Sequence, residues 1–115
     1  MDKMYYLASC DTCRKIIKML PENNLEMIDI RQNPLGEKEV DELKQVAGSY
    51  QALFSRKAQL YKSLGLKDQN LTEADYKKYL LEHYTFLSRP VFAIDGKIFI
   101  GNSKENVANA IEALK

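Results

Sequence analysis

Residues 4–20, MYYLASCDTCRKIIKML, decide how this chain is expected to fold. Residues 4–8 form a short, nearly continuous apolar run, which is typical of a central strand covered on both faces. Residues 9–11 then offer capping side chains for a helix of about ten residues that ends before Pro21. The apolar residues three, four and seven positions after Cys13 share one helical face with it. The stretch therefore predicts a strand that leads directly into an amphipathic helix, with two cysteines at the junction.

The elements on either side extend this strand and helix into a sheet. A second strand is expected at residues 25–30, and strand, helix and strand with short connections predict parallel pairing with a right-handed crossover. Near the end of the chain, two apolar runs at 90–94 and 97–100 flank Asp95-Gly96, which is a strong signal for a type I′ hairpin. Ser103 is the expected N-cap of a final helix.

The middle of the chain is expected to be helical. Three helices are predicted, at residues 36–47, 56–64 and from Thr72 to about His83, with Gly48 and Gly65 ending the first two. The predicted order is β-α-β, a helical block, and β-β-α. The outer parts match a thioredoxin-like sheet, so we expect an α/β fold in which a helical block at about 35–85 is inserted into a single domain spanning residues 1–115.

Composition excludes several classes of function. The chain has 115 residues, enough for one compact domain, and 17 basic residues against 16 acidic ones give a net charge of +1. No basic stripe is present, which argues against direct binding of nucleic acid. No apolar run is long enough to span a bilayer and no signal peptide is recognised, so we expect a cytoplasmic protein with no membrane partner.

The two cysteines, Cys10 and Cys13, are the most informative residues. A disulfide between them would close a very short loop and so would stabilise the fold little, which argues against a purely structural role. A zinc site needs about four ligands, whereas this chain has two cysteines and a single histidine, His83. We expect no metal site of its own. Redox or nucleophilic chemistry is the favoured interpretation, and a buried inert pair or a metal shared between molecules are the alternatives.

Their positions predict different roles for the two thiols. Cys10 lies at the expected helix start, where free backbone N–H groups and the helix dipole favour a thiolate, so it is the candidate nucleophile. Cys13 lies one turn further on the apolar face and is the candidate resolving thiol, which would displace the first product and close a disulfide. Arg14 and Lys15 add positive charge nearby, while Asp11 opposes them.

Arg89-Pro90 is the second candidate feature. A proline that opens a strand belongs at the strand end because it cannot donate to the ladder. In thioredoxin-like folds a cis-proline lies opposite the CxxC pair, so we expect Pro90 to be cis. Arg89 would then lie beside Cys10 and could bind an oxyanion or a glutathione carboxylate in bidentate fashion. Arg56, expected at the start of a helix, would by itself be taken for a surface residue.

Taken together, these motifs resemble the arsenate reductase-like family, the ArsC/Spx type of the thioredoxin-fold superfamily. The resemblance covers nearly the whole chain. It rests on Tyr5-Tyr6 with Cys10–Lys15, on Leu53–Arg56 followed by Tyr61–Leu66, on Phe86–Val91, and on Asp95–Lys97 with Ile100-Gly101. The Arg-Pro block at this distance from CxxC is specific for the family, whereas CxxC alone is not.

The resemblance implies a chemistry and a set of roles. In the family's arsenate reductases a cysteine matching Cys10 attacks arsenate, and arginines matching Arg56 and Arg89 hold the oxyanion. Glutathione and glutaredoxin recycle those enzymes. This chain differs at three positions: Asn102 replaces a third arginine, Tyr6 replaces a histidine, and Cys13 stands where serine is usual. Because each charge-assisted contact contributes about 1.5–3 kcal/mol, the missing arginine should weaken arsenate handling.

The expected function is therefore that of an arsenate reductase-like thiol-disulfide oxidoreductase. Cys10 would attack an oxyanion or a disulfide, Arg14, Arg56, Arg89 and Pro90 would bind the substrate, and Cys13 or glutathione would resolve the intermediate. No bound cofactor is expected, and glutathione, thioredoxin or glutaredoxin would act as external reductant. One alternative is an Spx-type regulator whose CxxC is a redox switch and whose partner is the RNA polymerase α subunit. The other is a thioredoxin-fold domain with a vestigial site.

Overall fold

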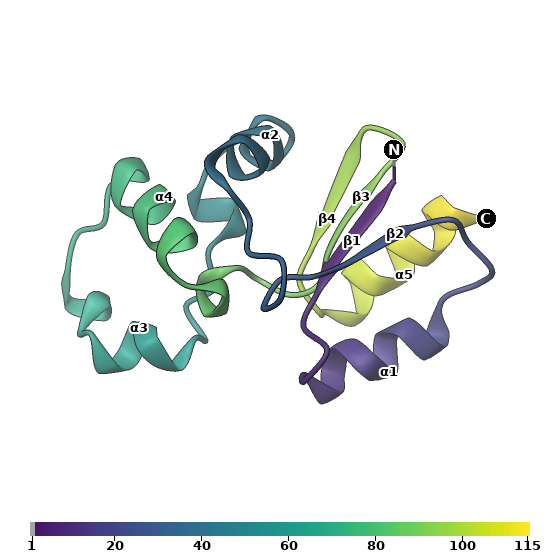
Figure 1. Cartoon of the computed structure of the whole chain (residues 1–115), viewed down its shortest axis with the longest axis horizontal. Coiled ribbons are helices and arrows are strands. Elements are labelled where there is room, and N and C mark those ends of the chain that lie inside the picture. Colours follow the sequence, from purple (N-terminus) through teal and green to yellow (C-terminus); the bar gives the residue numbers. More distant parts are fainter. Residues whose placement is uncertain (1) are drawn as a thin grey trace. The chain divides into compact units, whose positions relative to one another are not determined.

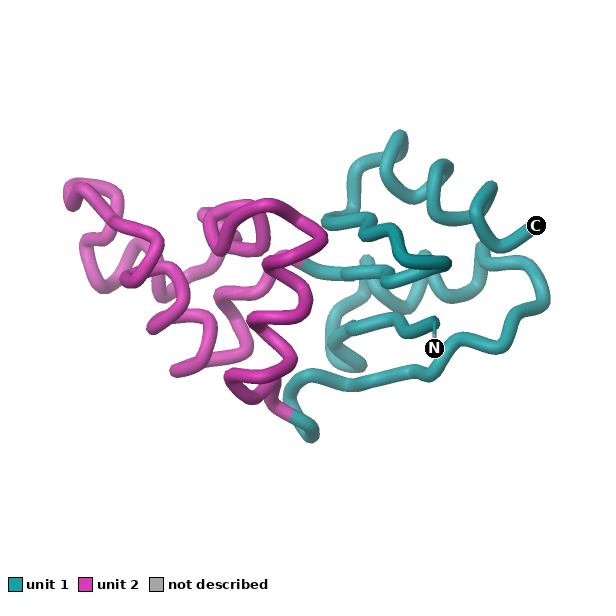
Figure 2. The backbone as a smooth tube through the Cα atoms, turned by 90° about the horizontal axis from the view of Figure 1, so that it is seen from above, with its two compact units in different colours: residues 1–33, 89–115 teal, residues 34–88 magenta. Residues whose placement is uncertain are grey.

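The computed structural model describes residues 2–115, which form two compact units (Figure 2). The first unit combines the residues up to Asn33 with Arg89–Lys115, and the second is the segment Pro34–Ser88 between them. The residue range of this second unit is close to that of the helical block expected at about 35–85. Each unit is described by itself below.

The first unit is built on a four-stranded sheet with the strand order β2-β1-β3-β4. The strands are β1 (Lys3–Tyr6), β2 (Glu26–Asp29), β3 (Val91–Ile94) and β4 (Lys97–Ile100). β1 runs parallel to β2, and both the β1–β3 and the β3–β4 pairs are antiparallel. The expected β-α-β and β-β-α halves are therefore confirmed, and they join where β1 pairs with β3.

Two helices, α1 (Asp11–Met19) and α5 (Lys104–Leu114), cover one face of this sheet (Figure 1). The side chains that β1 and β3 direct at these helices are fully buried or nearly so, and burying one large apolar side chain contributes about 1.5–3 kcal/mol. The core consists of Met4, Ile16, Leu25, Phe92, Ile94, Val107 and Ala110. The apolar stripe expected on the first helix is therefore what attaches α1 to the sheet.

The hairpin between β3 and β4 has the predicted turn. Asp95 and Gly96 adopt φ values of 52° and 75°, so both central residues are left-handed, as a type I′ turn requires. The backbone N–H of Asp95 donates to the Asp2 carboxylate at 2.9 Å, which ties the turn to the start of the chain. Ser103 accepts a hydrogen bond from the Asn106 N–H at 3.1 Å and is the expected N-cap of α5.

The second unit contains three α-helices and three single turns of 3₁₀ helix. The α-helices are α2 (Glu37–Ala47), α3 (Gln59–Ser63) and α4 (Glu73–Glu82), and the 3₁₀ turns are η1 (Gln51–Leu53), η2 (Leu66–Asp68) and η3 (Tyr84–Phe86). The helix expected at 56–64 is shorter than predicted and begins at Gln59. Arg56 lies in a turn before it, because the Ser55 hydroxyl accepts from the Lys57 N–H at 3.3 Å and competes with helix formation.

An aromatic cluster holds the second unit together. Phe54 stacks on Phe86 with ring centroids 5.3 Å apart, and Tyr76 contacts Phe54 edge-on at 4.9 Å. Backbone hydrogen bonds join the segments around Phe54 and Phe86: Ser55 N donates to Phe86 O at 2.7 Å, and Ser88 N donates to Leu53 O at 2.8 Å. The turn that carries Arg56 therefore follows directly from a buried segment.

Charged side chains connect α2 to α4 on another surface of this unit. The Lys77 ammonium lies 3.0 Å from the Glu37 carboxylate and 3.1 Å from that of Asp41. The Tyr50 hydroxyl donates to Asp41 at 2.5 Å, and this bond together with Lys77 lowers the pKa of the Asp41 carboxyl. The positive charge of Lys77 is thus fully balanced by neighbouring carboxylates. Among residues 2–115, no helix is long and apolar enough to cross a membrane.

Candidate active site: a thiol pair at the start of a helix

The connection from β1 to α1 presents the two cysteines. A tight turn forms after Leu7, whose carbonyl accepts from the Cys10 N–H at 3.0 Å, and the Cys10 carbonyl then accepts the first helical hydrogen bond from Arg14 N at 3.1 Å. Cys10 is therefore the N-cap residue of α1, with extended backbone angles, and Cys13 lies one turn into the helix. Both are free thiols; Cys10 is partly exposed and Cys13 is only 1% exposed. The predicted asymmetry in exposure is present.

The pKa of the Cys10 thiol lies below its ordinary value. Partial burial by itself would raise this pKa, but the backbone N–H groups of Cys13 and Thr12 and the Cys13 thiol stabilise the thiolate more strongly, and the Arg89 charge adds to them. The N–H groups favour a negative charge at the helix start, although Cys10 makes no side-chain capping hydrogen bond. Cys10 is thus prepared to act as a nucleophile.

The pKa of Cys13 moves in the opposite direction. Burial is the largest cause, the thiolate of Cys10 and the hydrogen bond that Cys13 donates to it add to the effect, and together they raise the pKa of Cys13 to about 11. Cys13 therefore remains a protonated thiol at neutral pH. Two thiols three residues apart are held in different states, because one faces the helix terminus and the other faces the core.

Arg14 is engaged by its neighbours rather than by Cys10. Its guanidinium pairs with the Asp11 carboxylate and also donates to the Ala8 carbonyl at 3.1 Å. Among the main causes of the Cys10 pKa, the only charge from an arginine is that of Arg89. The lowering of the Cys10 pKa that was expected from Arg14 is therefore offset by Asp11. The positive charge that acts on the thiols is that of Arg89, which lies 79 positions after Cys10 in the sequence.

The peptide bond between Arg89 and Pro90 is cis, as expected. Pro90 is buried, and its carbonyl accepts from the Gly101 N–H at 2.8 Å, which fixes the start of β3 against the end of β4. Arg89 is half-buried with a buried Nε atom, and its charge acts on both Cys10 and Cys13. The structure therefore brings Cys10, Cys13 and Arg89 together in the first unit.

Arg56 belongs to the second unit. It is exposed, and its guanidinium donates to the Tyr76 hydroxyl at 3.5 Å, a bond that raises the pKa of Arg56 further. Asn102, which stands where the resemblance expects a third arginine, is exposed just after Gly101 in the first unit. The assignment of Arg56 to the substrate of Cys10 stays a prediction.

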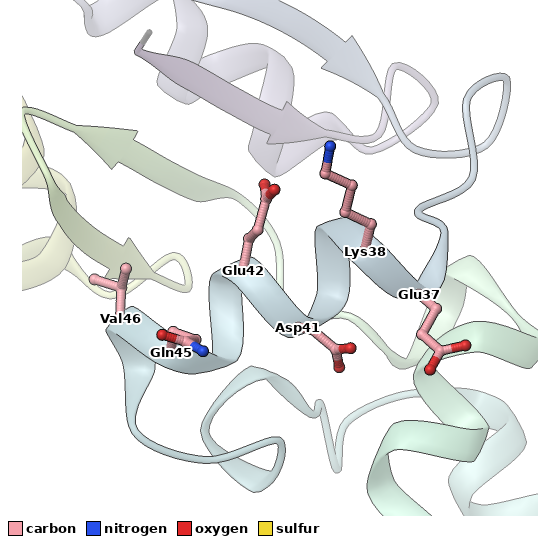
Figure 3. Close-up of a pocket in the computed structure, with 6 residues that line it drawn as sticks. All are labelled: Glu37, Lys38, Asp41, Glu42, Gln45 and Val46. Atoms are coloured by element: carbon pink, nitrogen blue, oxygen red, sulfur yellow. The ribbon is translucent and has the colours of Figure 1, made fainter.

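Two surface hollows lie in the second unit and contain neither cysteine. One, of about 810 Å³, is lined entirely by residues of α2: Glu37, Lys38, Asp41, Glu42, Gln45 and Val46. Figure 3 shows Lys38 and Glu42 projecting from one side of the helix and Glu37 and Asp41 from another. Glu37 and Asp41 are already paired with Lys77, so this acidic helix surface is a structural feature.

The other hollow, of about 520 Å³, is basic and was not anticipated from the sequence. It is lined by Arg56, Tyr61, Lys62, Lys67, Gln69, Leu71 and Tyr76. These residues follow no helical or strand period, and they share a pocket only because α3, η2 and the start of α4 fold against the aromatic cluster. Among residues 2–115, no group of three or more His, Cys, Asp or Glu side chains is arranged to hold a metal ion.

Comparison with known proteins places this geometry in a family. Relatives include an arsenate reductase of Neisseria meningitidis serogroup A, 26% identical over 91% of this chain and 93% of that protein. Another is the global transcriptional regulator Spx 2 of Bacillus anthracis, 26% identical over 90% of this chain and 82% of that protein. The solved structure of an arsenate reductase from Vibrio cholerae, 23% identical, superposes with a TM-score of 0.78 over 94% of this chain and 95% of that one, which confirms the predicted thioredoxin-like α/β fold. The model of the ArsC family matches residues 5–110, and the chain therefore belongs to the ArsC family.

Proposed function

We propose that this protein is a thiol-dependent reductase of the arsenate reductase type, in which Cys10 attacks an oxyanion or a disulfide and Cys13 or glutathione resolves the intermediate. The observation that carries the proposal is the opposite displacement of the two thiol pKa values. A lowered pKa at Cys10 and a pKa of about 11 at Cys13 are what an attacking thiolate and a waiting resolving thiol require.

With a disulfide substrate the chemistry is two successive exchanges. The Cys10 thiolate attacks one substrate sulfur, the substrate S–S bond breaks, and one substrate thiolate leaves and takes up a proton. Cys13 then loses its proton and attacks the Cys10 sulfur, which releases the second substrate thiol and forms a Cys10–Cys13 disulfide. The substrate gains two electrons and the protein loses two, and an external dithiol or two glutathione molecules return them.

With an oxyanion such as arsenate, the first bond forms between the Cys10 sulfur and the central atom, with loss of water. A second thiol, Cys13 or glutathione, then attacks the Cys10 sulfur, the sulfur–arsenic bond breaks, and its electron pair reduces arsenic(V) to arsenic(III). Arg89 is proposed to hold the anion beside Cys10, and Arg56 to supply a second cationic contact. Asn102 offers a neutral contact in place of a third arginine, which favours disulfides or weaker oxyanion binding over tight arsenate binding.

The test is mass spectrometry of the reduced protein after exposure to a small disulfide, such as oxidised glutathione, and separately to arsenate with glutathione. We expect an internal Cys10–Cys13 disulfide in the native protein. In the Cys13→Ser variant, a one-glutathione adduct should accumulate on Cys10, because the resolving thiol is missing. In the Cys10→Ser variant, neither adduct nor disulfide should form at a comparable rate.

Each arm of this experiment can contradict the proposal. An adduct that forms on Cys13 in the Cys10→Ser variant would reverse the roles assigned to the two thiols. Unchanged turnover in Cys10→Ser would remove the thiol mechanism altogether. A reaction with disulfide but none with arsenate would keep the thiol chemistry and exclude the oxyanion as a substrate.

A second candidate function is a redox-switch regulator of the Spx type. It is favoured by the match to Spx 2 over 82% of that protein's length. The family resemblance also implies that such regulators carry a CxxC pair like Cys10 and Cys13. Its test is a pull-down with the C-terminal domain of the RNA polymerase α subunit, using the reduced protein and the Cys10–Cys13 disulfide form. Binding that depends on redox state would support regulation, and no binding in either state would exclude it.

A further inference from the structure

The outward face of α1, formed by Lys15, Lys18 and Met19, begins beside Cys10 and is exposed. Cys13 is buried on the inner face of the helix, whereas Lys15 and Lys18 lie three positions apart on the opposite face. α1 lies at the margin of the first unit, with α5 and the sheet on the same side of it (Figure 1). A partner can therefore contact this face and reach the partly exposed Cys10 at the same time.

The outward face of α1 carries positive charge that its neighbours do not balance. α1 contains three cationic residues and one carboxylate, and the Arg14–Asp11 pair leaves the charges of the two lysines over. Within residues 2–115, no ion pair involves Lys15 or Lys18. Neither lysine is among the main causes of the Cys10 pKa, so their charge does not act chiefly on the thiol. It is free to attract an anionic surface.

Met19 adds an apolar contact beside these lysines. Its side chain is 60% exposed, the highest value for a large apolar residue in the described part of the chain. Methionine is enriched in interfaces and adapts its shape to the surface that it meets. Transient redox complexes bury little surface, below about 1,200 Å² in total, and a methionine beside two cations suits such a contact. The face therefore fits a partner that leaves after each reaction.

We propose that the outward face of α1 docks an acidic dithiol protein that reduces the Cys10–Cys13 disulfide, an inference that rests on the proposed reductase function. Carboxylates of the partner would contact Lys15 and Lys18, which gives the encounter its orientation. A helix rises 1.5 Å per residue, so Lys18 lies about 12 Å along the axis from Cys10. Glutathione is too small to cover this face while its thiol reacts at Cys10, and the face therefore favours a protein as the external reductant.

The reaction at the docked partner is two thiol–disulfide exchanges. Because Cys13 is only 1% exposed, the partner thiolate must attack the Cys10 sulfur. The Cys10–Cys13 bond breaks, Cys13 leaves as a thiolate and takes up a proton, and a mixed disulfide joins the partner to Cys10. The second partner thiol then attacks the partner sulfur of this mixed disulfide and releases Cys10 as a thiolate. The partner loses two electrons and the cysteine pair gains them.

The exposed route of attack gives docking its advantage. It expels Cys13, whose raised pKa of about 11 makes it a slow leaving group. A partner held on α1 keeps its thiol beside Cys10 at a high effective concentration, which offsets the slow departure. A small dithiol in solution gains nothing from the face.

The experiment uses the full-length protein oxidised to its Cys10–Cys13 disulfide. Rate constants for its reduction are measured with reduced thioredoxin, reduced glutaredoxin, glutathione and dithiothreitol, at low and at physiological salt. At least one of the two proteins should react about 100-fold or more faster than dithiothreitol, and its rate should fall several-fold as the salt concentration rises. If dithiothreitol or glutathione reduces the disulfide as fast as both proteins, docking is refuted while the thiol chemistry stands. If no disulfide forms, both proposals fail.

Matched variants locate the docking face. Lys15→Glu combined with Lys18→Glu should slow the protein reductant by about tenfold or more and leave reduction by dithiothreitol within about twofold. Met19→Gln keeps both charges and should slow the protein reductant several-fold. Lys97→Glu combined with Lys115→Glu reverses two exposed charges away from α1 and should change the rate by less than about twofold. Equal losses in the two double variants, or faster reduction after the α1 charges are reversed, would overturn the proposal.

Discussion

The two units of the molecule each neutralise one cation, but they direct their other positive charges to different surroundings. In the first unit, Arg14 is neutralised by Asp11, and the charge of Arg89 acts on two thiols. In the second unit, Lys77 is neutralised, whereas Arg56, Lys62 and Lys67 line one pocket whose lining residues include no carboxylate. A cation beside a thiol changes its pKa and therefore its covalent reactivity, whereas a cation in a pocket without a nucleophile can only bind. The first unit thus places a cation near two thiols, and the second gathers cations in a pocket whose lining contains no cysteine.

The largest expected effect is the difference in reactivity between the two thiols. Since the pKa of Cys10 is below its ordinary value and that of Cys13 is raised to about 11, their thiolate fractions at pH 7.5 should differ by about 100-fold or more. Iodoacetamide at limiting dose should therefore alkylate Cys10 first, as peptide mass spectrometry would measure. Comparable alkylation of both residues at early times would contradict the asymmetry of the pair.

A second prediction concerns the pH dependence of stability. The raised pKa of Cys13 means that the folded protein holds this proton more tightly than the unfolded chain, whose cysteines titrate near 8.5. The stabilising contribution is complete below about pH 8.5 and is lost as the pH rises towards 11, by an amount on the order of 3 kcal/mol. The lowered pKa of Cys10 acts with the opposite sign and adds stability as its thiolate forms.

Urea unfolding at pH 8, 9 and 10 would measure this effect. The Cys13→Ala variant is the matched control, because it keeps every lysine and tyrosine that also titrates in this range. Native protein should lose more free energy of unfolding than the variant between pH 8 and 10. Parallel curves would show that Cys13 is not held as a buried, protonated thiol.

Two arginines of the first unit, Arg89 and Arg14, provide a third test. Arg89→Met removes the charge that acts on Cys10, so the pKa of Cys10 should rise and its alkylation at pH 7 should slow several-fold, up to about tenfold. Arg14→Met removes a charge already paired with Asp11 and should change the rate much less. Arg89→Lys, which keeps the charge, should restore part of the rate if the effect is electrostatic. A larger effect from Arg14 than from Arg89 would reverse the assignment.

Much of the fold could be predicted because its signals are local. The apolar run before Cys10, the Asp95-Gly96 turn and the Ser103 cap each act within a few residues, and each is present where expected. The helix expected from residue 56 is shorter, because a hydroxyl–backbone bond at Ser55 outweighs the helical pattern of the following residues. The sequence alone does not decide which of two such local signals determines where the helix begins.

The candidate site was predicted less completely, because its parts come from distant segments. The positions of Cys10 and Cys13 follow from the helix start, and those of Arg89 and cis-Pro90 from the expected thioredoxin-like fold. The engagement of Arg14 was missed, although Asp11 three residues earlier was a readable signal for an ion pair. The basic pocket could not be read from sequence, because the spacing of Arg56, Lys62 and Lys67 has no meaning until the aromatic cluster folds the chain around it.

The smallest expected effects come from the helix caps, and they test whether the two units unfold together. In the second unit, the Thr72 hydroxyl accepts from Asp75 N at 3.3 Å, while the Asp75 carboxylate accepts from Thr72 N at 2.9 Å. In the first unit, Ser103 caps α5 with one bond at 3.1 Å. Thr72→Ala and Ser103→Ala should each lower the free energy of unfolding by about 1 kcal/mol.

Because the sequence predicts a single domain, we expect one cooperative transition in which either substitution shifts the same midpoint. Urea unfolding followed by circular dichroism and by tyrosine fluorescence would check this, since the two signals should coincide in both variants. Hydrogen exchange would sharpen the result: under native conditions Thr72→Ala should lower protection most in residues 73–82, and Ser103→Ala in residues 104–114. Two separated transitions, with each substitution affecting only one of them, would mean that the two units are independently stable bodies.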